Sequence, residues 1–183
     1  MQLLFSAEGQ SWPIKLTGDA ERTRSAMLRT LPFELQLHTP KIAGSHIYWH
    51  APFVEDVEGA THVLDAKAGA FIYWPVRQFL EITFAPLQAE TAQVTVLGHL
   101  DAPIEGITAL AATLKRDQGR RILSGSLTLT EGEMPAPAPA SGLPSDILEA
   151  RTRLWVACPE DISRVTASRA IMHPAGPVFA AEA

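Results

Sequence analysis

The chain has 183 residues, of which 46% are apolar and 19% are charged, and its net charge is −5. A chain of this length buries enough surface to fold as one domain, with room for an appendage. The negative charge argues against a nucleic-acid partner, because binding to phosphates needs a basic face and the Lys and Arg residues here are scattered.

The beginning of the chain predicts a hairpin and a helix. Residues 2–7 and 11–16 are short apolar segments around a Gly-containing turn, which is typical of a β-hairpin. Asp19 then suits the N-cap position of a helix over residues 20–31. We expect Pro32 to end this helix, because the residue before a proline avoids the α-helical region.

From Phe33 onward apolar and polar residues alternate, which indicates strands. The expected strands are residues 33–38, 46–51, 69–74, 79–84, 93–97 and 121–129. Between the last two, an apolar stripe over residues 104–114 predicts a second helix that Gly119 ends. Many short strands separated by Gly, Pro and Asp favour an antiparallel sandwich or barrel, and two helices capping a barrel fit this order.

The composition changes at Glu131, where Pro and Ala become frequent. We expect a barrel over residues 1–130, a Pro/Ala-rich linker over residues 131–144 and a helical appendage over residues 145–183. The appendage is too short for a core of its own, so it should pack on its own barrel or on a neighbouring chain. This predicts a homo-oligomer formed through residues 145–183.

Cysteine usage and hydropathy indicate the compartment. Cys158 is the single cysteine, so no intrachain disulfide can form. The first residues lack the basic and apolar regions of a signal peptide, and no apolar run approaches the roughly 20 residues that cross a bilayer. We therefore expect a cytoplasmic protein with no membrane partner.

Four motifs follow one another over residues 1–130. They are LLFSAEGQSWPIKL with a helix ending in LRTLPFE, then GSHIYWHAP, GAFIYWPVRQFLEITFAP and VLGHLDAPIEGITALAATLKRDQGRRI. In pattern and order the chain resembles the small bacterial and archaeal proteins of unknown function with a cyclophilin-like fold. The resemblance implies a mainly β, small closed antiparallel barrel with two capping helices, in a bacterial protein. This chain departs from the pattern of those proteins at two places. It has Val76 and Arg77 where they have Pro-Gly, and Ser45-His46 in the region where they have a glutamate.

The resemblance to true cyclophilins is weaker. Peptidyl-prolyl isomerases of that fold carry a Phe-His-Arg strand, in which the arginine polarises the substrate amide. The nearest stretch here, Leu37-His38-Thr39-Pro40, has no arginine. Peptidyl-prolyl isomerase activity is therefore not expected.

Arg77 is the first candidate binding residue because it follows Tyr73-Trp74-Pro75. An arginine beside aromatic rings can hold a carboxylate in its fork while the rings stack on an apolar body. Glu81, four residues on, faces the same side of the expected strand. The alternative is that Arg77 and Glu81 form an ordinary ion pair on a solvated strand face.

The histidines of the barrel are the second set of candidates. They are His38, His46, His50, His62 and His99. His46 and His50 should share a strand face, but four residues of strand span about 13 Å, too far for one metal ion. We expect structural or surface histidines, no metal and no cofactor. The alternative is a catalytic histidine paired with a carboxylate such as Glu34 or Glu81.

Two pairs of adjacent aromatics, Tyr48-Trp49 and Tyr73-Trp74, should each place one ring inside the barrel and one outside. The outward rings would lie under a helix, at an interface, or on the floor of a ligand pocket. No G-x-S-x-G, P-loop or G-x-G-x-x-G motif occurs.

Three hypotheses for the function follow. The first is a small-molecule binding or accessory domain, with a carboxylate as the possible ligand. Its expected binding residues are Arg77, Trp74, Tyr73, Glu81, His46 and His50. The second is an enzyme, an isomerase or a hydrolase that uses a histidine with a carboxylate. The third is a structural or oligomerisation module.

Overall fold

The structure, a computed structural model, describes residues 1–40, 44–87 and 92–132. The linker beyond Gly132 and the appendage expected over residues 145–183 lie outside these residues. The described part of the chain contains no helix long and apolar enough to pass through a bilayer.

Short strands dominate the described residues, and two α-helices interrupt them. In chain order the elements are β1 (Gln2–Ala7), β2 (Gln10–Leu16), α1 (Glu21–Leu28), β3 (Phe33–Leu37), β4 (His46–His50), β5 (Thr61–His62), the 3₁₀ turn η1 (Val63–Asp65), β6 (Ala70–Trp74), β7 (Phe79–Thr83), β8 (Gln93–Leu100), α2 (Ile104–Asp117) and β9 (Leu123–Glu131). The strands pair antiparallel in the order β3-β9-β1-β2-β8-β6-β7-β4, and β5 pairs with β8.

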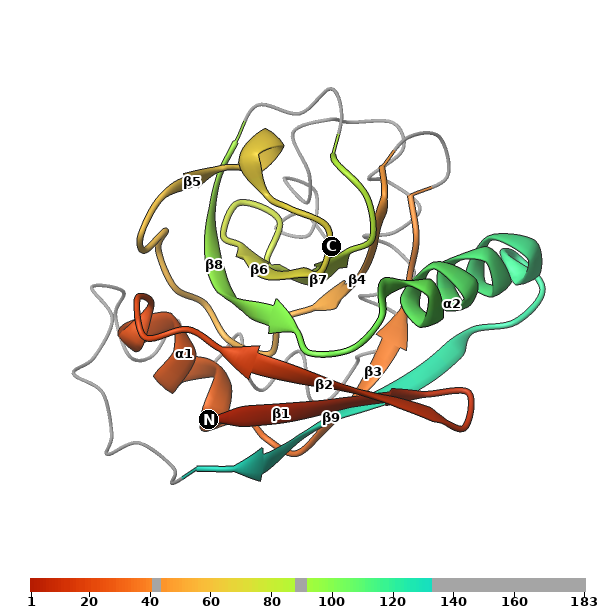
Figure 1. Cartoon of the computed structure of the whole chain (residues 1–183), viewed down its shortest axis with the longest axis horizontal. Helices are drawn as coiled ribbons and strands as arrows, with labels where there is room; N and C mark the ends of the chain where they lie inside the picture. The colour runs from red at the N-terminus through yellow and green to blue at the C-terminus, as the bar shows by residue number, and fades with distance from the viewer. Residues whose placement is uncertain (41–43, 88–91, 133–183) are drawn as a thin grey trace, which may run out of the picture.

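The two ends of this sheet curl round until they meet, so the barrel is nearly closed (Figure 1). Where β3 ends and β4 passes, His38 and Tyr48 each donate a backbone N–H to the other's carbonyl at 2.9 Å. The expectation of a mainly β antiparallel barrel with two helices is confirmed.

The interior of the barrel is a stack of aromatic rings. Phe5 of β1 stacks on Trp49 of β4, with ring centroids 5.4 Å apart, although β1 and β4 are not neighbours in the sheet. The contact therefore crosses the interior. Both helices add their buried faces to this core, which Met27 of α1 and Leu110 of α2 join.

The adjacent aromatics separate as their alternation predicts. Trp49 and Tyr73 belong to the interior core, whereas Tyr48 and Trp74 belong to a second apolar cluster on the outer face of the same strands. Neither α1 nor α2 contributes to this second cluster. Among the described residues, Val63 and Ala66, in and after η1, pack there instead.

Helix α1 begins and ends differently from the prediction. Ala20, not Asp19, is its N-cap, and no side chain of the cap residue bonds to the helix. The carboxylate of Glu58 does so instead, accepting the N–H of Arg22 at 3.1 Å and that of Thr23 at 2.8 Å. A carboxylate at the positive end of the helix is favourable whichever part of the chain supplies it. The helix ends at Leu28, before the expected residue 31.

Glu58 belongs to an irregular segment, residues 51–60, which we call the strap. The Glu58 N–H donates to Thr95 Oγ1 of β8 at 2.8 Å. The Glu55 N–H donates to the phenol oxygen of Tyr73 at 3.1 Å, and the Glu55 carboxylate lies 3.1 Å from Arg22. The strap therefore joins α1 to the barrel.

Candidate functional site

The register of three strands places a row of polar and aromatic side chains on the outer face of the barrel. Residues paired directly across antiparallel strands point to the same face. Across β4, β7 and β6 these rows are, in that order, Tyr48, Glu81 and Ile72, and then His50, Phe79 and Trp74. His46 of β4 pairs with Thr83 of β7. We use the name outer cluster for His38, His46, Tyr48, His50, Trp74, Arg77, Phe79 and Glu81.

The outer cluster is buried although much of it is polar. Glu81 is 0% exposed, His46 4% and Tyr48 6%. The alternative that Arg77 and Glu81 lie on a solvated strand face is therefore wrong for Glu81. A carboxylate is rarely taken wholly out of water, because burial of an ion is costly unless charges or hydrogen bonds compensate it. This position in the middle of β7 is thus unusual for a glutamate.

His46 and Glu81 face each other inside the cluster. Nε2 of His46 lies 3.8 Å from Oε2 of Glu81, which is longer than a hydrogen bond. Burial, reinforced by the charge of Arg77, lowers the pKa of His46 to about 3, so its imidazole is neutral at pH 7. Its Nδ1 is buried and has no hydrogen-bond partner among residues 1–40, 44–87 and 92–132.

Gly44 gives the His46 ring its space. A Cβ at Gly44 would lie 2.8 Å from Cε1 and 3.1 Å from Nδ1 of His46, and φ of Gly44 is +123°. An L-residue would therefore be strained here and would also press on the imidazole edge that carries Nδ1.

The other two histidines of the cluster are also neutral. Burial lowers the pKa of His38 to about 4, and burial with the nearby His38 lowers that of His50 to about 3. Burial, and then the charge of Glu81, raises the pKa of Tyr48 above its usual range, while Arg77 acts against this shift. The three imidazoles of the cluster are therefore neutral at pH 7.

The turn between β6 and β7 positions Arg77. Its guanidinium carbon lies 4.3 Å from the centroid of the Trp74 ring, a cation–π contact. The backbone carbonyl of Gln78 accepts the N–H of Ala51 at 2.8 Å, which fastens the turn to the end of β4. Arg77 itself is half-buried.

Aromatic rings form a continuous wall beside these charges. Tyr48 stacks on Phe79 with centroids 4.6 Å apart, and His50 meets Phe79 edge-on at 4.8 Å. His38 and His46 lie 5.3 Å and 5.8 Å from the Tyr48 ring. The cluster thus combines an apolar surface with one cation, one carboxylate and neutral imidazoles.

Of the six residues that the sequence suggested for a binding site, Tyr73 alone lies elsewhere. The other five, Arg77, Trp74, Glu81, His46 and His50, share the outer face. Tyr73 points into the barrel because its neighbour Trp74 points outward, and its ring lies 4.9 Å from that of Phe53.

Three members of the cluster are not among those six: His38, Tyr48 and Phe79. Tyr48 could have been included, since it lies between His46 and His50 in the alternation of β4. His38 joins through the bridge that closes the barrel, which no local pattern predicts. Glu34, the other carboxylate considered, is exposed on β3. In the described residues, no three His, Cys, Asp or Glu side chains come close enough to hold a metal ion.

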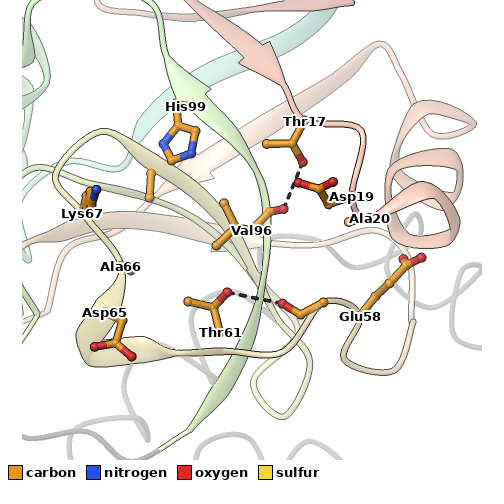
Figure 2. A pocket seen from close by; sticks show the side chains of 12 residues that line it. Thr17, Asp19, Ala20, Glu58, Thr61, Asp65, Ala66, Lys67, Val96 and His99 are labelled. Atoms are coloured by element: carbon orange, nitrogen blue, oxygen red, sulfur yellow. Dashed lines mark hydrogen bonds between the residues drawn. The ribbon is translucent and has the colours of Figure 1, made fainter.

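A groove of about 320 Å³ opens on the described part of the barrel (Figure 2). The start of α1, the strap, η1 and β8 surround it. Of the residues that line it, Ala66 and Ala70 are buried, whereas Lys67 and His99 are exposed. None of the six expected binding residues lines this groove.

No protein-family model matches the chain, and no curated protein matches it. Several solved structures share the fold, and two of them are described here. The structure of McbB in complex with tryptophan superposes with a TM-score of 0.60 at 14% identity, over 88% of this chain and 58% of McbB. The solution structure of a hypothetical protein from Archaeoglobus fulgidus superposes with a TM-score of 0.50 at 20% identity, over 70% of this chain and 93% of that protein. This chain thus spans a little over half of the McbB chain.

Proposed function

We propose that the outer cluster binds a small molecule that carries a carboxylate beside an aromatic or apolar body. The contact of Arg77 with Trp74, 4.3 Å from guanidinium carbon to ring centroid, is the observation that carries this proposal. A guanidinium held against a ring keeps N–H donors in a fixed fork, which matches the two oxygens of a carboxylate.

The surroundings of Arg77 support the same ligand chemistry. The wall of Trp74, Phe79 and Tyr48 offers buried aromatic surface to an apolar body. McbB, which shares the fold, is described in complex with tryptophan, a molecule with an indole ring and a carboxylate. An indole carboxylate is therefore a suitable first probe.

The test is calorimetric titration of the whole chain with indole-3-propionate. We expect saturable binding, and we expect Arg77→Ala to weaken it by about 10- to 100-fold, the effect of losing hydrogen bonds to a charged group. Arg120→Ala is the matched control, because Arg120 is an exposed arginine after α2. Binding that is absent in the wild type, or unchanged in Arg77→Ala, would reject the proposal.

The contact between His46 and Glu81 favours a second candidate, an enzyme that transfers a proton. A neutral imidazole can accept a proton, and the facing carboxylate would stabilise the imidazolium that forms. Phenylpyruvate in deuterium oxide is a direct probe, since exchange at the carbon beside its carbonyl is visible by NMR. Exchange that is faster with the wild type than with His46→Gln supports the enzyme, and equal rates exclude this chemistry.

Four further expectations stand as proposals. The barrel fits the cyclophilin-like group on motif order. A cytoplasmic location and the absence of a nucleic-acid partner are supported by the single cysteine and the net charge of −5. Homo-oligomerisation through residues 145–183 is tested by sedimentation of the whole chain against one ending at Gly132. An unchanged oligomeric state would remove that proposal.

A further inference from the structure

The groove shown in Figure 2 offers both open space and free side chains, and it shares no residue with the outer cluster. Its volume of about 320 Å³ lies at the lower end of the range for small-molecule sites. Four ionisable side chains that line it have no hydrogen bond or ion pair within the described ranges: Asp19, Asp65, Lys67 and His99. All four are exposed, so a ligand that enters the groove can reach them.

Strand β8 passes between the two sides of the groove. In the sheet β8 lies between β2 and β6. Asp19 follows β2, whereas Asp65 and Lys67 precede β6. Figure 2 shows Asp19 on one side of Val96, a residue of β8, and Asp65 and Lys67 on the other. A ligand in the groove would therefore lie across β8 and meet different groups at its two ends.

The β2 side of the groove presents carboxylates. Asp19 provides a free one. Gly59 of the strap lies beside Asp19, since a Cβ at Gly59 would be 3.8 Å from the Asp19 carbonyl oxygen. The preceding strap residue, Glu58, adds a second carboxylate to this side. Neither Lys nor Arg is among the residues that line this side of the groove.

The arginines at the start of α1 are engaged elsewhere. The guanidinium of Arg22 is paired with Glu55 at 3.1 Å, and that of Arg24 donates to the backbone carbonyl of Thr17. Burial would raise the pKa of Glu58, but hydrogen bonds from the backbone of α1 outweigh burial and hold this pKa below its usual range. Glu58 therefore contributes negative charge and Asp19 contributes free oxygens. An ammonium group, with three N–H donors and no acceptor, suits this side.

The β6 side presents donors and acceptors together. Lys67 offers N–H donors, Asp65 offers carboxylate oxygens, and the ring of His99 offers nitrogen atoms. The formal charges of Lys67 and Asp65 cancel, so this side does not favour a second ion. Hydroxyl groups suit it, because a hydroxyl both donates and accepts, and hydrogen bonds to charged partners are stronger than those between neutral groups.

Small side chains line the space between the two sides. Ala20, Ala66 and Ala70 are buried there, and Val96 is half-buried. His99 is the single residue with a ring among those that line the groove. An aromatic ligand would therefore find little to stack on, and a compact aliphatic body fits better.

We propose that this groove is a second binding site, which takes a small aliphatic amine that carries hydroxyl groups, with the size and chemistry of an amino sugar. The ammonium of the ligand lies at Asp19, and its hydroxyls bond to Asp65, Lys67 and His99. This site is independent of the function proposed for the outer cluster.

The experiment is an NMR titration of the whole chain with three probes, in a buffer that keeps their amines protonated. D-Glucosamine carries an ammonium and hydroxyls, D-glucose lacks the ammonium, and cyclohexylamine lacks the hydroxyls. We expect glucosamine to bind about ten-fold more tightly than either analogue. The amide signals of Thr17, Gly59 and His99 should move. Glucosamine that does not bind, that binds no better than an analogue, or that moves signals only outside the groove would overturn the inference.

Two substitutions test the two ends of the ligand separately. Asp19→Asn should lower the affinity for glucosamine to that for glucose and leave glucose binding unchanged. Lys67→Met should weaken the binding of both sugars and should not weaken that of cyclohexylamine. Because Asp19 and Lys67 are exposed and have no partner within the described part of the chain, both variants should keep the fold.

The matched controls are Asp56→Asn and Lys115→Met, at exposed residues that do not line the groove. We expect them to bind the three probes as the wild type does. Losses as large in the controls would show that the net charge of −5, and not the groove, attracts the amine. That result, or glucosamine binding that Asp19→Asn leaves unchanged, would also overturn the inference.

Discussion

Strands β4, β6 and β7 have two buried faces of opposite character. Toward the interior, Trp49 stacks between Phe5 and Phe71 with centroid distances of 5.4 Å and 6.0 Å. Toward the outside, the next residues along β4 are His50 and Tyr48, which adjoin Glu81. Both faces are buried, but the outer one contains the histidines and Glu81.

The difference between the two faces indicates that the inner face stabilises the fold and that the outer face serves recognition. The interior gains from dispersion and from apolar surface removed from water, so each ring there contributes to folding. The outer cluster buries a carboxylate and lowers the pKa values of three histidines, which opposes folding. Polar groups retained against such a cost are typical of a functional site.

The largest effect should follow from breaking the inner face. Trp49→Ala should destabilise the chain by about 3–5 kcal/mol, the range for removing a large aromatic side chain from a core. Urea unfolding followed by circular dichroism would measure it. Arg77→Ala, on the outer side of the same sheet, should leave the midpoint nearly unchanged. A similar loss in the two variants would contradict the separation of the faces.

The stability of the chain at acid pH should depend on the buried histidines of the outer cluster. Histidine in the unfolded chain titrates near pH 6.5, whereas His38, His46 and His50 take up protons in the fold only near pH 3 to 4. Between these values the unfolded chain binds more protons, so stability falls as the pH falls. The slope is about 1.4 kcal/mol per pH unit for each such histidine.

The measurement is the free energy of unfolding at several pH values between 7.5 and 5. His46→Gln should reduce the slope of the free energy of unfolding against pH by the contribution of one histidine. A slope that the substitution leaves unchanged would show that His46 titrates normally in the folded chain.

A small change in stability should also come from Glu81→Gln. The amide keeps the size of the side chain and a hydrogen-bonding oxygen, so we expect the free energy of unfolding to shift by no more than about 1 kcal/mol, the net contribution of one hydrogen bond. Thermal and urea unfolding would measure the shift. A loss several times larger would mean that the carboxylate is required for folding and would weaken its assignment to recognition.

Strand positions could be predicted from the sequence because alternation reports which side of a strand each residue faces. The same rule could have excluded Tyr73 from the site, since Trp74 was needed on the outer face. It could not supply His38, which reaches the cluster through pairing at the seam of the barrel. Burial of Glu81 was likewise beyond local patterns, because segments remote in the chain, such as η1, pack on that face.

The start of α1 illustrates the same limit. Asp19 has the right identity and place for a cap, yet it is exposed and Glu58 takes that role. N-cap propensity compares only the residues next to the start of a helix. A carboxylate from a remote segment such as the strap can accept the same backbone N–H groups.

The dependence of α1 on Glu58 has a kinetic consequence. The helix has 8 residues, and isolated helices shorter than about 12 residues are scarcely stable in water. Its cap comes from a position 35 residues away in the chain. Helix α1 should therefore form late in folding, after the strap has settled on β8. In the native protein, the amide hydrogens of Arg22 and Thr23 should exchange with solvent only when strap and helix open as one cooperative unit.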